Sequence, residues 1–246
     1  MKYLAFCENI NTPAHQLVEN KKDVEALPGN LKFPLFVKPA KAGDSLGIDD
    51  TSKVLDITSL KNKVDKIVDE FGEALVEEYI DGREFTVLVC ANPDGKTATS
   101  FTPVEYLFPN GFQFKTYAIK TSELHPNANV PVAEASLAAK LQSTAEQIFT
   151  AFNGVGYARM DFRMDGNGVI YFLEINFTCS VFYTDGFEGS ADYILKLNNV
   201  GQDDFLIRII KEGTERHLKK QKKYFIKGDP YHCYCHKTTR LIKEKL

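Results

Sequence analysis

The sequence predicts an α+β fold, and two patterns in its 246 residues support this class. Short segments in which apolar and polar residues alternate are typical of half-buried strands, and tight turns between several of them favour antiparallel hairpins. Two longer segments instead repeat their apolar residues with the period of a helix. Antiparallel hairpins mixed with helices in this way are typical of α+β proteins.

The first half of the chain is predicted to contain one amphipathic helix among short strands. The helix begins at Ser59 and ends at Gly72, since its apolar residues recur with a period of 3.6 and glycine commonly follows a last helical turn. Its apolar stripe consists of Leu60, Val64, Ile67, Val68 and Phe71. The expected strands are residues 15–18, 31–38, 74–80 and 84–90. The strand at 31–38 is expected to be buried through Phe33, Leu35, Phe36 and Val37.

The second half is predicted to contain a returning strand, a long helix, a charged hairpin and two further helices. The strand spans residues 100–107. The long helix follows Pro131 and stops at Asn153–Gly154, and its inner face is formed by Leu137, Leu141, Ile148, Phe149 and Phe152. After the hairpin and an irregular loop, helices are expected at residues 191–198 and 203–213.

The hairpin of residues 157–176 concentrates charged side chains on one face. One face of its first strand carries Tyr157, Arg159, Asp161 and Arg163. In its second strand Glu174 and Asn176 share a face, and the other face carries Val169, Tyr171, Leu173 and Ile175. The turn at residues 165–168 supplies residues that tolerate positive φ. Folding the chain there brings Asp161 roughly opposite Glu174.

The charged face of the hairpin presents oxygen ligands suited to a divalent cation. Asp161, Glu174 and Asn176 supply two carboxylates and an amide oxygen, the hard ligands that suit Mg²⁺, with Mn²⁺ as a second candidate. Two carboxylates that face each other across a ladder repel unless a cation lies between them. The alternative interpretation is an exposed polar face on an edge hairpin.

Three basic side chains are candidates for binding anionic groups. Lys38 follows a buried strand and precedes a loop of small residues at 40–48, whose amides can wrap phosphates, and Lys115 is a second candidate. The loop is not a P-loop, because the Gly-Lys-Ser/Thr run is missing. Arg159, beside Asp161, can stabilise an oxyanion in a transition state. The alternatives are ordinary surface lysines and a simple salt bridge of Arg159 with a carboxylate.

An extended segment before a turn is a candidate for binding a nucleobase. Residues 75–80 offer backbone N–H and C=O groups to the edge of a base, and Glu84 can accept hydrogen bonds from ribose hydroxyls. The alternative is that these acidic residues are merely solvated.

Composition and charge are those of a soluble globular protein. Hydrophobic residues make up 43% and charged residues 26%, and the net charge is −3, so the whole molecule is not a binder of polyanions. The charge is uneven, because residues 211–246 contain eleven Lys and Arg but four Asp and Glu. Five scattered cysteines do not indicate a disulfide framework. With no apolar run long enough to span a membrane and no secretory signal, we expect a cytoplasmic protein.

Three blocks of the chain resemble the ATP-grasp superfamily, and specifically its D-alanine:D-alanine ligase group. The blocks are residues 33–40 with Gly43 and 45–48, residues 76–87, and residues 159–162 with 173–176. The resemblance covers about residues 10–210. It implies an ATP-grasp fold, with two α+β subdomains that bind nucleotide between them. The expected divisions are residues 1–80 with the phosphate lysine and loop, residues 81–210 with the metal site, and a basic tail at 211–246.

The resemblance also implies roles for single residues. Lys38 and Lys115 would hold ATP phosphates, with Ser45 in the phosphate loop. Glu77, Tyr79 and Ile80 would line the adenine edge, and Glu84 would bind ribose. Asp161, Glu174 and Asn176 would hold Mg²⁺, and Arg159 would steady a tetrahedral intermediate. The implied activity is an ATP-dependent, ADP-forming carboxylate–amine ligase that joins amino acids or short peptides through an acyl phosphate.

Three departures from the family pattern stand out. Asp44 precedes Ser45 where the family usually has Ser-Ser. Thr178-Cys179-Ser180 replaces the usual Pro-Gly turn after Asn176, so that the amide of Ser180 would complete the oxyanion hole. Ser190 is a weaker candidate for binding the carboxylate of the acceptor. The α/β domain that precedes this part of the family has no counterpart in the sequence.

Two other functions compete with the ligase. The chain can be an ATP-binding protein of the same fold whose ligase activity is lost or depends on a partner, or an interaction module that works through its basic tail. The expected partners are amino-acid or dipeptide substrates and a second copy in a homodimer, without a membrane or a nucleic acid. A catalytic thiol at Cys179 and a zinc site at His232, Cys233, Cys235 and His236 are minor alternatives.

Overall fold

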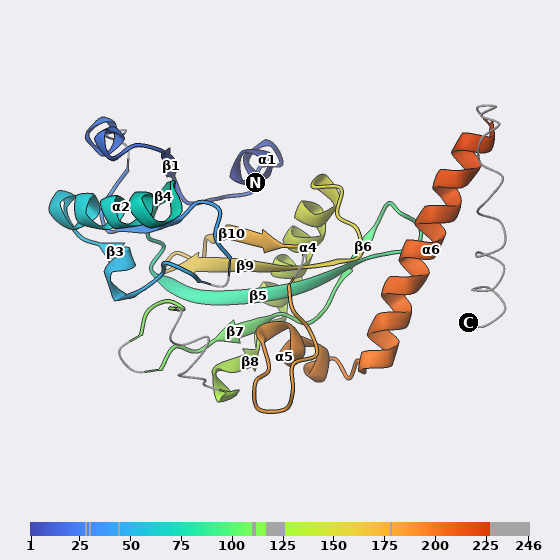
Figure 1. Cartoon of the computed structure of the whole chain (residues 1–246). Coiled ribbons are helices and arrows are strands. Elements are labelled where there is room, and N and C mark those ends of the chain that lie inside the picture. The colour runs from blue at the N-terminus through green and yellow to red at the C-terminus, as the bar shows by residue number, and fades with distance from the viewer. Residues whose placement is uncertain are drawn as a thin grey trace.

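The computed structural model describes residues 1–27, 29, 31–43, 45–109, 112–116, 126–177 and 179–226. Within them the strands form two antiparallel sheets, one of four strands and one of six. The sheets lie side by side in Figure 1, where helix α2 marks the smaller one. Antiparallel sheets combined with helices confirm the predicted α+β class.

The smaller sheet has the strand order β1-β4-β2-β3 and is covered on one face by α2 (Ile57–Phe71). Its strands are β1 (His15–Val18), β2 (Leu35–Pro39), β3 (Lys53–Val54) and β4 (Ala74–Glu78). The apolar face of α2 packs with one face of the sheet in a core that includes Leu35, Val37, Val54, Leu60, Val64, Ile67, Ala74 and Val76. Burial of this core holds the helix on the sheet.

The opposite face of the smaller sheet carries residues that were selected from the sequence. Side chains alternate along a strand, so Phe36 and Lys38 point away from the core that buries Leu35 and Val37. Glu77 lies opposite Phe36 in the register of β2 and β4 and therefore shares its face. This uncovered face forms one wall of the pocket described below.

Two predicted elements have different bounds in the structure. The strand expected at 31–38 is limited to β2, and the expectation that Phe33 is buried is wrong, because its side chain is 42% exposed. Pro34, which has no N–H to donate to a ladder, follows it. The helix begins at Ile57 instead of Ser59, since the Asp56 carboxylate accepts the N–H of Ser59 at 2.8 Å and caps it.

The larger sheet has the strand order β10-β9-β5-β7-β8, with β6 also paired to β5. Its strands are β5 (Gly82–Ala91), β6 (Ala98–Ser100), β7 (Val104–Tyr106), β8 (Asn129–Pro131), β9 (Tyr157–Asp165) and β10 (Ile170–Asn176). The single strand expected at 100–107 is therefore two strands. Pro103 lies between them and cannot donate a ladder hydrogen bond.

Helices cover both faces of the larger sheet. On one face α4 (Ala135–Ala151) packs with Phe85, Val87 and Val89 of β5. On the other face α5 (Ser190–Leu197) and the first turns of α6 (Gln202–Ile226) pack with Leu88 and Cys90. Because α5 covers only the end of β5 that carries these two residues, the opposite end of the same face stays open toward the smaller sheet.

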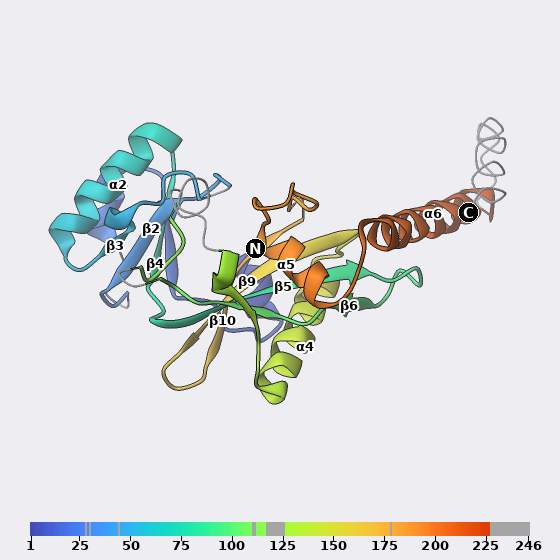
Figure 2. The same cartoon turned by 90° about the horizontal axis from the view of Figure 1, so that it is seen from below.

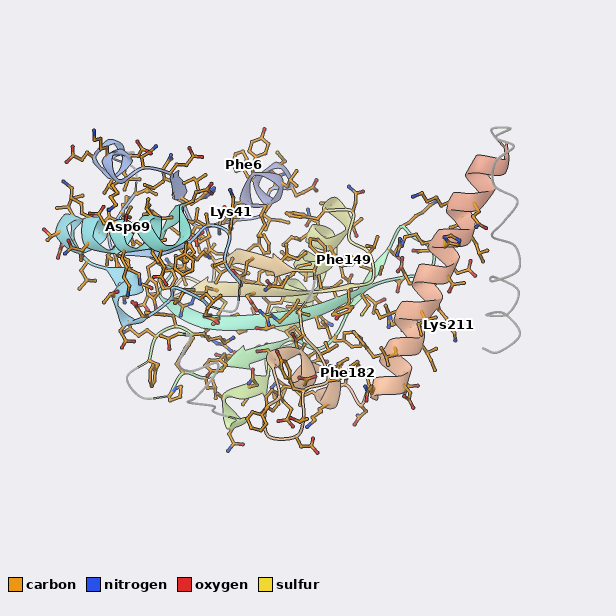
Figure 3. The ribbon with its side chains drawn as sticks, in the orientation of Figure 1. Phe6, Lys41, Asp69, Phe149, Phe182 and Lys211 are labelled. Carbon is orange, nitrogen blue, oxygen red and sulfur yellow. The ribbon has the colours of Figure 1, made fainter. Side chains whose placement is uncertain are left out.

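The shorter helices complete the fold. Helix α1 (Lys2–Cys7) packs against β10, with Ala5 in the core that also contains Phe149 of α4. Figure 3 shows Phe149 between α4 and the sheet, whereas Phe6 points away from the molecule. Short 3₁₀ helices lie at Lys21–Ala26, Asp50–Ser52 and Pro126–Ala128.

The charged hairpin has the predicted pairing. Asp161 of β9 lies opposite Glu174 of β10, and Asn176 lies opposite Arg159. The predicted turn at residues 165–168 is present, with Gly168 at φ 78°. The carboxylates of Asp161 and Glu174 are thus neighbours on one ladder.

The alternation along β10 differs from the prediction. A bulge between Phe172 and Glu174 inserts Leu173 as an extra residue and shifts the register. Phe172 therefore faces the core, while Tyr171 lies opposite Arg163, and the prediction that Tyr171 and Ile175 share a face is wrong. Of Tyr171 and Ile175, only Ile175 belongs to the core, because the bulge reverses the alternation along the strand.

Helix α6 continues past the expected end at 213, and Figure 2 shows from below that it extends outward from the larger sheet. Buried Glu212 accepts the N–H of Gly156 at 3.3 Å, and Lys219 donates to the carbonyl oxygens of Pro93 and Asp94 at 2.8 Å.

The divisions of the chain that were expected at residues 80 and 210 remain predictions, and residue 211, the expected start of the tail, lies inside α6. The cluster at 232–236 lies outside the described residues, and no described helix is long and apolar enough to cross a membrane.

Gly82 begins β5 in a conformation that only glycine adopts readily. Its φ is 146°, and a Cβ atom would lie 2.1 Å from the carbonyl oxygen of Met164. We therefore expect Gly82→Ala to lower the free energy of unfolding by about 3 kcal/mol, measured by urea denaturation. Gly166→Ala is the control, because a methyl group at that position would meet no atom within 4 Å and the φ of Gly166 is not positive. Equal midpoints for the two variants would contradict this account.

Candidate functional site

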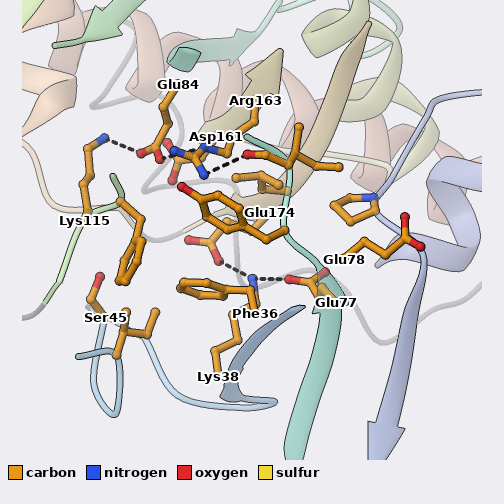
Figure 4. Close-up of a pocket in the computed structure, with 16 residues that line it drawn as sticks. Phe36, Lys38, Ser45, Glu77, Glu78, Glu84, Lys115, Asp161, Arg163 and Glu174 are labelled. Atoms are coloured by element: carbon orange, nitrogen blue, oxygen red, sulfur yellow. Dashed lines mark hydrogen bonds and ion pairs between the residues drawn. The ribbon is translucent and has the colours of Figure 1, made fainter. Parts of the chain in front are cut away.

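A pocket between the two sheets brings together most of the residues selected from the sequence. Nine of the twelve line it: Lys38, Ser45, Glu77, Tyr79, Ile80, Glu84, Lys115, Asp161 and Glu174. They come from β2, the loop after it, β4 and the linker to β5 on one side, and from β5, β9, β10 and the segment around Lys115 on the other. Figure 4 shows their side chains converging on one space. Arg159, Asn176 and Ser180 are not among the lining residues.

Lys38 lies at the centre of an ionic network on the floor of the pocket. Its Nζ is 2.9 Å from Oε2 of Glu77 and 3.8 Å from Oε2 of Glu174 (Figure 4). The other oxygen of Glu77, Oε1, lies 2.5 Å from Nζ of Lys2, which reaches this point from α1. The smaller and larger sheets are thus joined by charge at the site where their polar faces meet.

Burial and charge act in opposite directions on this network. Burial alone would raise the pKa of Glu77, but the ammonium groups of Lys38 and Lys2 outweigh it and lower that pKa to about 2. Burial disfavours the charged form of Lys38 as well, yet Glu77 and Glu174 raise its pKa above the ordinary value. Burial dominates at Lys2 and lowers its pKa. Both Glu77 and Lys38 are therefore charged at neutral pH.

The loop after β2 is held in place by a buried lysine of α2. Nζ of Lys63 donates to the carbonyl oxygen of Gly47 at 3.1 Å and to Asp49 at 2.8 Å. Gly47 has φ 75°, and a Cβ there would lie 2.7 Å from the ring of Pro39. The described part of the predicted loop thus approaches β2 closely and carries Ser45 to the edge of the pocket. Asp44 lies outside the described residues.

Aromatic rings form an apolar wall next to the charged floor. Phe36 packs edge-on against Phe114 at 5.0 Å between ring centroids and lies roughly parallel to Tyr79 at 6.2 Å. The hydroxyl of Tyr79 donates to the carbonyl oxygen of Gln113 at 2.9 Å. A planar group entering the pocket would meet these rings on one side and the linker at Ile80 on another.

Glu84 and Lys115 form an ion pair across the pocket from the rings. Nζ of Lys115 lies 3.1 Å from Oε1 of Glu84 and 4.5 Å from the centroid of Tyr106. Glu84 is nearly buried, and its second oxygen faces Nε of Arg163 at 3.5 Å. Figure 4 shows Lys115 reaching Glu84 from a separate segment of chain. The cation thus lies at the rim of the pocket that is opposite Lys38.

The predicted metal ligands form a second polar group beside Lys38. Asp161 accepts a hydrogen bond from the hydroxyl of Thr86 at 2.8 Å and lies 3.1 Å from a guanidinium nitrogen of Arg159. Asp161 raises the pKa of Arg159 further above its ordinary value. The amide nitrogen of Asn176 is 3.4 Å from Oε1 of Glu174. The hairpin therefore places two carboxylates, an amide and an arginine on one face.

Ser180 and Cys179 lie beyond the end of β10. Ser180 is exposed, and no described contact joins it to the pocket. Cys179 is buried, and burial raises the pKa of its thiol to about 11, which argues against a nucleophilic thiolate at neutral pH. Among the described residues no cluster of three His, Cys, Asp or Glu side chains has a metal-binding arrangement. The predicted set differs from such a cluster because its third member is an amide.

Two residues of this site were not selected from the sequence. Nη1 of Arg163 donates to the carbonyl oxygen of Ile80 at 2.9 Å, Nη2 donates to Gln113, and the guanidinium lies 4.8 Å from the centroid of Tyr79. Arg163 could have been selected from the sequence, because it lies two residues after Asp161 in the same strand and therefore on the same face. Lys2 could not have been selected in this way, since no pattern near the first residues of the sequence indicates that a helix there packs against β10.

Comparison with solved structures identifies the fold. A D-alanine–D-alanine ligase from Coxiella burnetii superimposes with a TM-score of 0.66 at 20% identity and covers 92% of this chain and 58% of its own. The VanG D-Ala:D-Ser ligase from Enterococcus faecalis superimposes with a TM-score of 0.66 at 23% identity, and the match covers 85% of this chain and 58% of that ligase. A D-alanine–D-alanine ligase from Bacillus anthracis, solved with ATP, superimposes with a TM-score of 0.64 at 19% identity, and the match covers 90% of this chain and 66% of that ligase. The two sheets with a pocket between them therefore have the ATP-grasp fold, as predicted.

Sequence comparison places the chain in one family of this fold. A D-alanine–D-alanine ligase from Lactococcus lactis subsp. cremoris (strain SK11) is 30% identical over 210 residues, which are 81% of this chain and 56% of the relative. One from Cupriavidus pinatubonensis (strain JMP 134 / LMG 1197) is 24% identical over 218 residues, with 87% and 62% covered. The family model of the D-ala D-ala ligase C-terminus matches residues 5–184, and the chain belongs to that family. It spans somewhat more than half the length of these relatives.

The depressed pKa of Glu77 predicts a specific dependence of stability on pH. Its pKa falls from 4.5 to about 2 on folding, so its contribution is complete above pH 4.5 and is lost as the pH falls toward 2. That contribution is at most about 3 kcal/mol. We expect Glu77→Gln, which removes the carboxylate shared by two buried lysines, to be less stable at pH 7 and to lose less stability between pH 5 and pH 3.

Urea denaturation at several pH values measures this effect. Glu25→Gln is the control, because Glu25 forms an exposed ion pair with Lys61 in the same part of the chain. The Glu25 variant should keep the pH dependence of the unchanged protein. A Glu77→Gln variant with an equally steep loss of stability would show that Glu77 is not the titrating group.

Proposed function

We propose that this protein is an ATP- and Mg²⁺-dependent carboxylate–amine ligase that forms ADP and joins amino acids or short peptides. One observation carries the proposal: Nζ of Lys38 lies between the carboxylates of Glu77 and Glu174, and Asp161 faces Glu174 on the adjoining strand. A lysine beside paired carboxylates suits a site that binds polyphosphate together with a divalent cation. Membership in the ligase family supports the same conclusion.

Different regions of the pocket suit different parts of ATP. The rings of Phe36 and Tyr79 and the backbone at Ile80 suit the adenine base, and Glu84 suits ribose hydroxyls. Lys38 and Lys115 lie on opposite sides of the space that remains and suit the phosphates, with Ser45 at the edge. In this assignment the role of Glu77 is to hold Lys38, and its contribution to the base comes from the backbone of β4.

The donors on β9 and β10 fit Mg²⁺. Asp161, Glu174 and Asn176 offer hard oxygens on one face of a hairpin, and Glu174 is only partly buried, so water and phosphate can complete the coordination. Two carboxylates paired across a ladder favour a cation between them. The bound cation would neutralise charge on the phosphates during transfer.

The remaining polar groups suit acyl transfer. Arg159 carries a buried Nε without a hydrogen-bond partner among the described residues, next to the proposed metal ligands. Such an unsatisfied donor suits an oxyanion that forms when an amine attacks an activated carboxylate. Ser180, as an exposed residue of the loop after β10, is the candidate for a backbone donor to the same oxyanion.

The alternative is an ATP-binding protein whose ligase activity is lost or depends on a partner. The chain spans 56% of the ligase from Lactococcus lactis, so the activity of that whole enzyme does not transfer automatically. ATP hydrolysis measured with a panel of amino acids and dipeptides separates the two functions. ADP release stimulated by particular amino acids supports the ligase, and nucleotide binding without such stimulation supports the alternative. The same purified protein tests the proposed homodimer by its molar mass in solution.

Neutralising the proposed metal ligands should abolish turnover without unfolding the protein. Asp161→Asn and Glu174→Gln each remove a ligand charge, and we expect Mg²⁺-dependent ADP formation to fall at least about 100-fold. Asp185→Asn is the control, since Asp185 is fully exposed and pairs with Lys196 outside the pocket. Unchanged activity in both site variants would remove the metal site from the proposal.

Removing the central lysine should weaken nucleotide binding. We expect Lys38→Ala to reduce ATP affinity by about 10- to 100-fold, because a charge-assisted contact to phosphate is lost. Isothermal titration calorimetry measures the change. Lys41→Ala is the matched control, because Lys41 follows the same strand but its side chain is 78% exposed and pairs with Glu73. Equal ATP affinity in the Lys38 variant and the control would refute the assignment.

A further inference from the structure

Lys2 enters the polar network beneath the pocket from an element that no site motif includes. Its Nζ lies 2.5 Å from Oε1 of Glu77 and donates to the carbonyl oxygen of Leu173 at 3.1 Å. Lys2 is 7% exposed and is not among the residues that line the pocket. Its charge therefore faces Glu77 and β10, and a bound ligand would not touch it.

One carboxylate is thus shared by two lysines. Oε1 of Glu77 faces Lys2, and Oε2 faces Lys38 at 2.9 Å. A pair made of Lys38 and Glu77 alone would carry no net charge, and the carboxylate would offset the attraction of Lys38 for an anion. With Lys2 protonated, the side chains of Lys2, Glu77 and Lys38 together carry one positive charge. At short range in a buried site, one elementary charge changes binding substantially.

The three side chains of this network differ in exposure. The side chain of Glu77 is 4% exposed and that of Lys38 is 15% exposed, and both line the pocket, whereas Lys2 does not. Lys2 therefore balances the charge of Glu77 from outside the pocket, and the remaining positive charge lies on Lys38, which faces the pocket. The bulge at Leu173 supports this arrangement, because the carbonyl oxygen of that residue accepts a hydrogen bond from Lys2 beside the ion pair of Lys2 with Glu77.

We propose that Lys2 is a positioning residue that neutralises Glu77 and thereby leaves the charge of Lys38 available to the phosphates of a bound nucleotide. The inference rests on the proposed nucleotide site and adds a residue that acts without touching the ligand. Lys2 could act through the charge available at Lys38 or only through the packing of α1 on β10, and the two effects can be separated. A purely structural role, in which Lys2 only fastens α1 to β10, would change the binding of every ligand alike.

The test compares a ligand that carries phosphates with one that lacks them. We expect Lys2→Met to reduce the affinity for ATP about tenfold, while the affinity for adenosine stays unchanged. Calorimetric titration of the full chain with each ligand measures both. Lys2→Arg, which keeps the charge, should retain most of the ATP affinity. Lys21→Met is the control for the loss of a lysine charge, because Lys21 forms an exposed ion pair with Asp69.

A second pair of variants tests the charge balance directly. Lys2→Met combined with Glu77→Gln removes one positive and one negative charge, and ATP affinity should return close to that of the unchanged protein. Glu77→Gln alone removes the carboxylate between the two lysines but keeps both positive charges, and it should bind ATP more tightly than the double variant. This comparison holds even where Lys2→Met alone fails to fold, since the double variant contains no unpaired carboxylate.

The outcomes distinguish this inference from the proposed function. Unchanged protein that binds no ATP overturns the nucleotide site and the inference with it. Unchanged protein that binds ATP, together with a Lys2→Met variant of equal ATP affinity or of equally reduced ATP and adenosine affinity, overturns the inference alone. A loss confined to ATP, with recovery in the double variant, supports it.

Discussion

The register of the hairpin formed by β9 and β10 is the constraint on which the site depends. Without the bulge at Leu173, the pairing of Phe172 with Phe162 would place Leu173 opposite Asp161. The extra residue instead puts Glu174 there, while Phe172 remains in the core. One inserted residue thus lets the same strand bury Phe172 in the core and place the carboxylate of Glu174 opposite Asp161.

The two sheets meet through charge at this position, while the apolar cores lie within each sheet and its helices. The smaller sheet buries one face under α2, and the larger sheet has helices on both faces but leaves one end of the α5 face open. The open surfaces carry Lys38 and Glu77 on one side and Asp161 and Glu174 on the other. Buried ionic groups are costly unless they are paired. The network is therefore stable as a set, and a ligand that changes one of its charges acts on all of them.

Local sequence patterns predicted much of this structure, and their failures have physical causes. Period-two alternation predicted that Asp161 lies roughly opposite Glu174, and the two residues do pair, although the bulge is what makes their register match. It did not predict the bulge, since the alternation rule assumes that neither strand contains an extra residue. Gly72 and the stripe of α2 predicted that helix, whereas its first residue depended on the cap at Asp56.

Long-range contacts account for the rest of what the sequence did not predict. Lys2 and Glu77 are far apart in the chain, and only the packing of α1 on β10 brings them together. Arg163 was placed on the correct face, but its bonds to Ile80 and Gln113 depend on how separate segments fold over β9. Local patterns thus predicted most of the residues that line the pocket but not the side chains that hold them in place.

The ties of Lys63 to Gly47 and Asp49 fasten the loop after β2 to α2. The end of the loop that carries Gly47 and Asp49 is therefore linked to the position of α2, and a shift of that helix on the smaller sheet would be transmitted to residues beside the pocket.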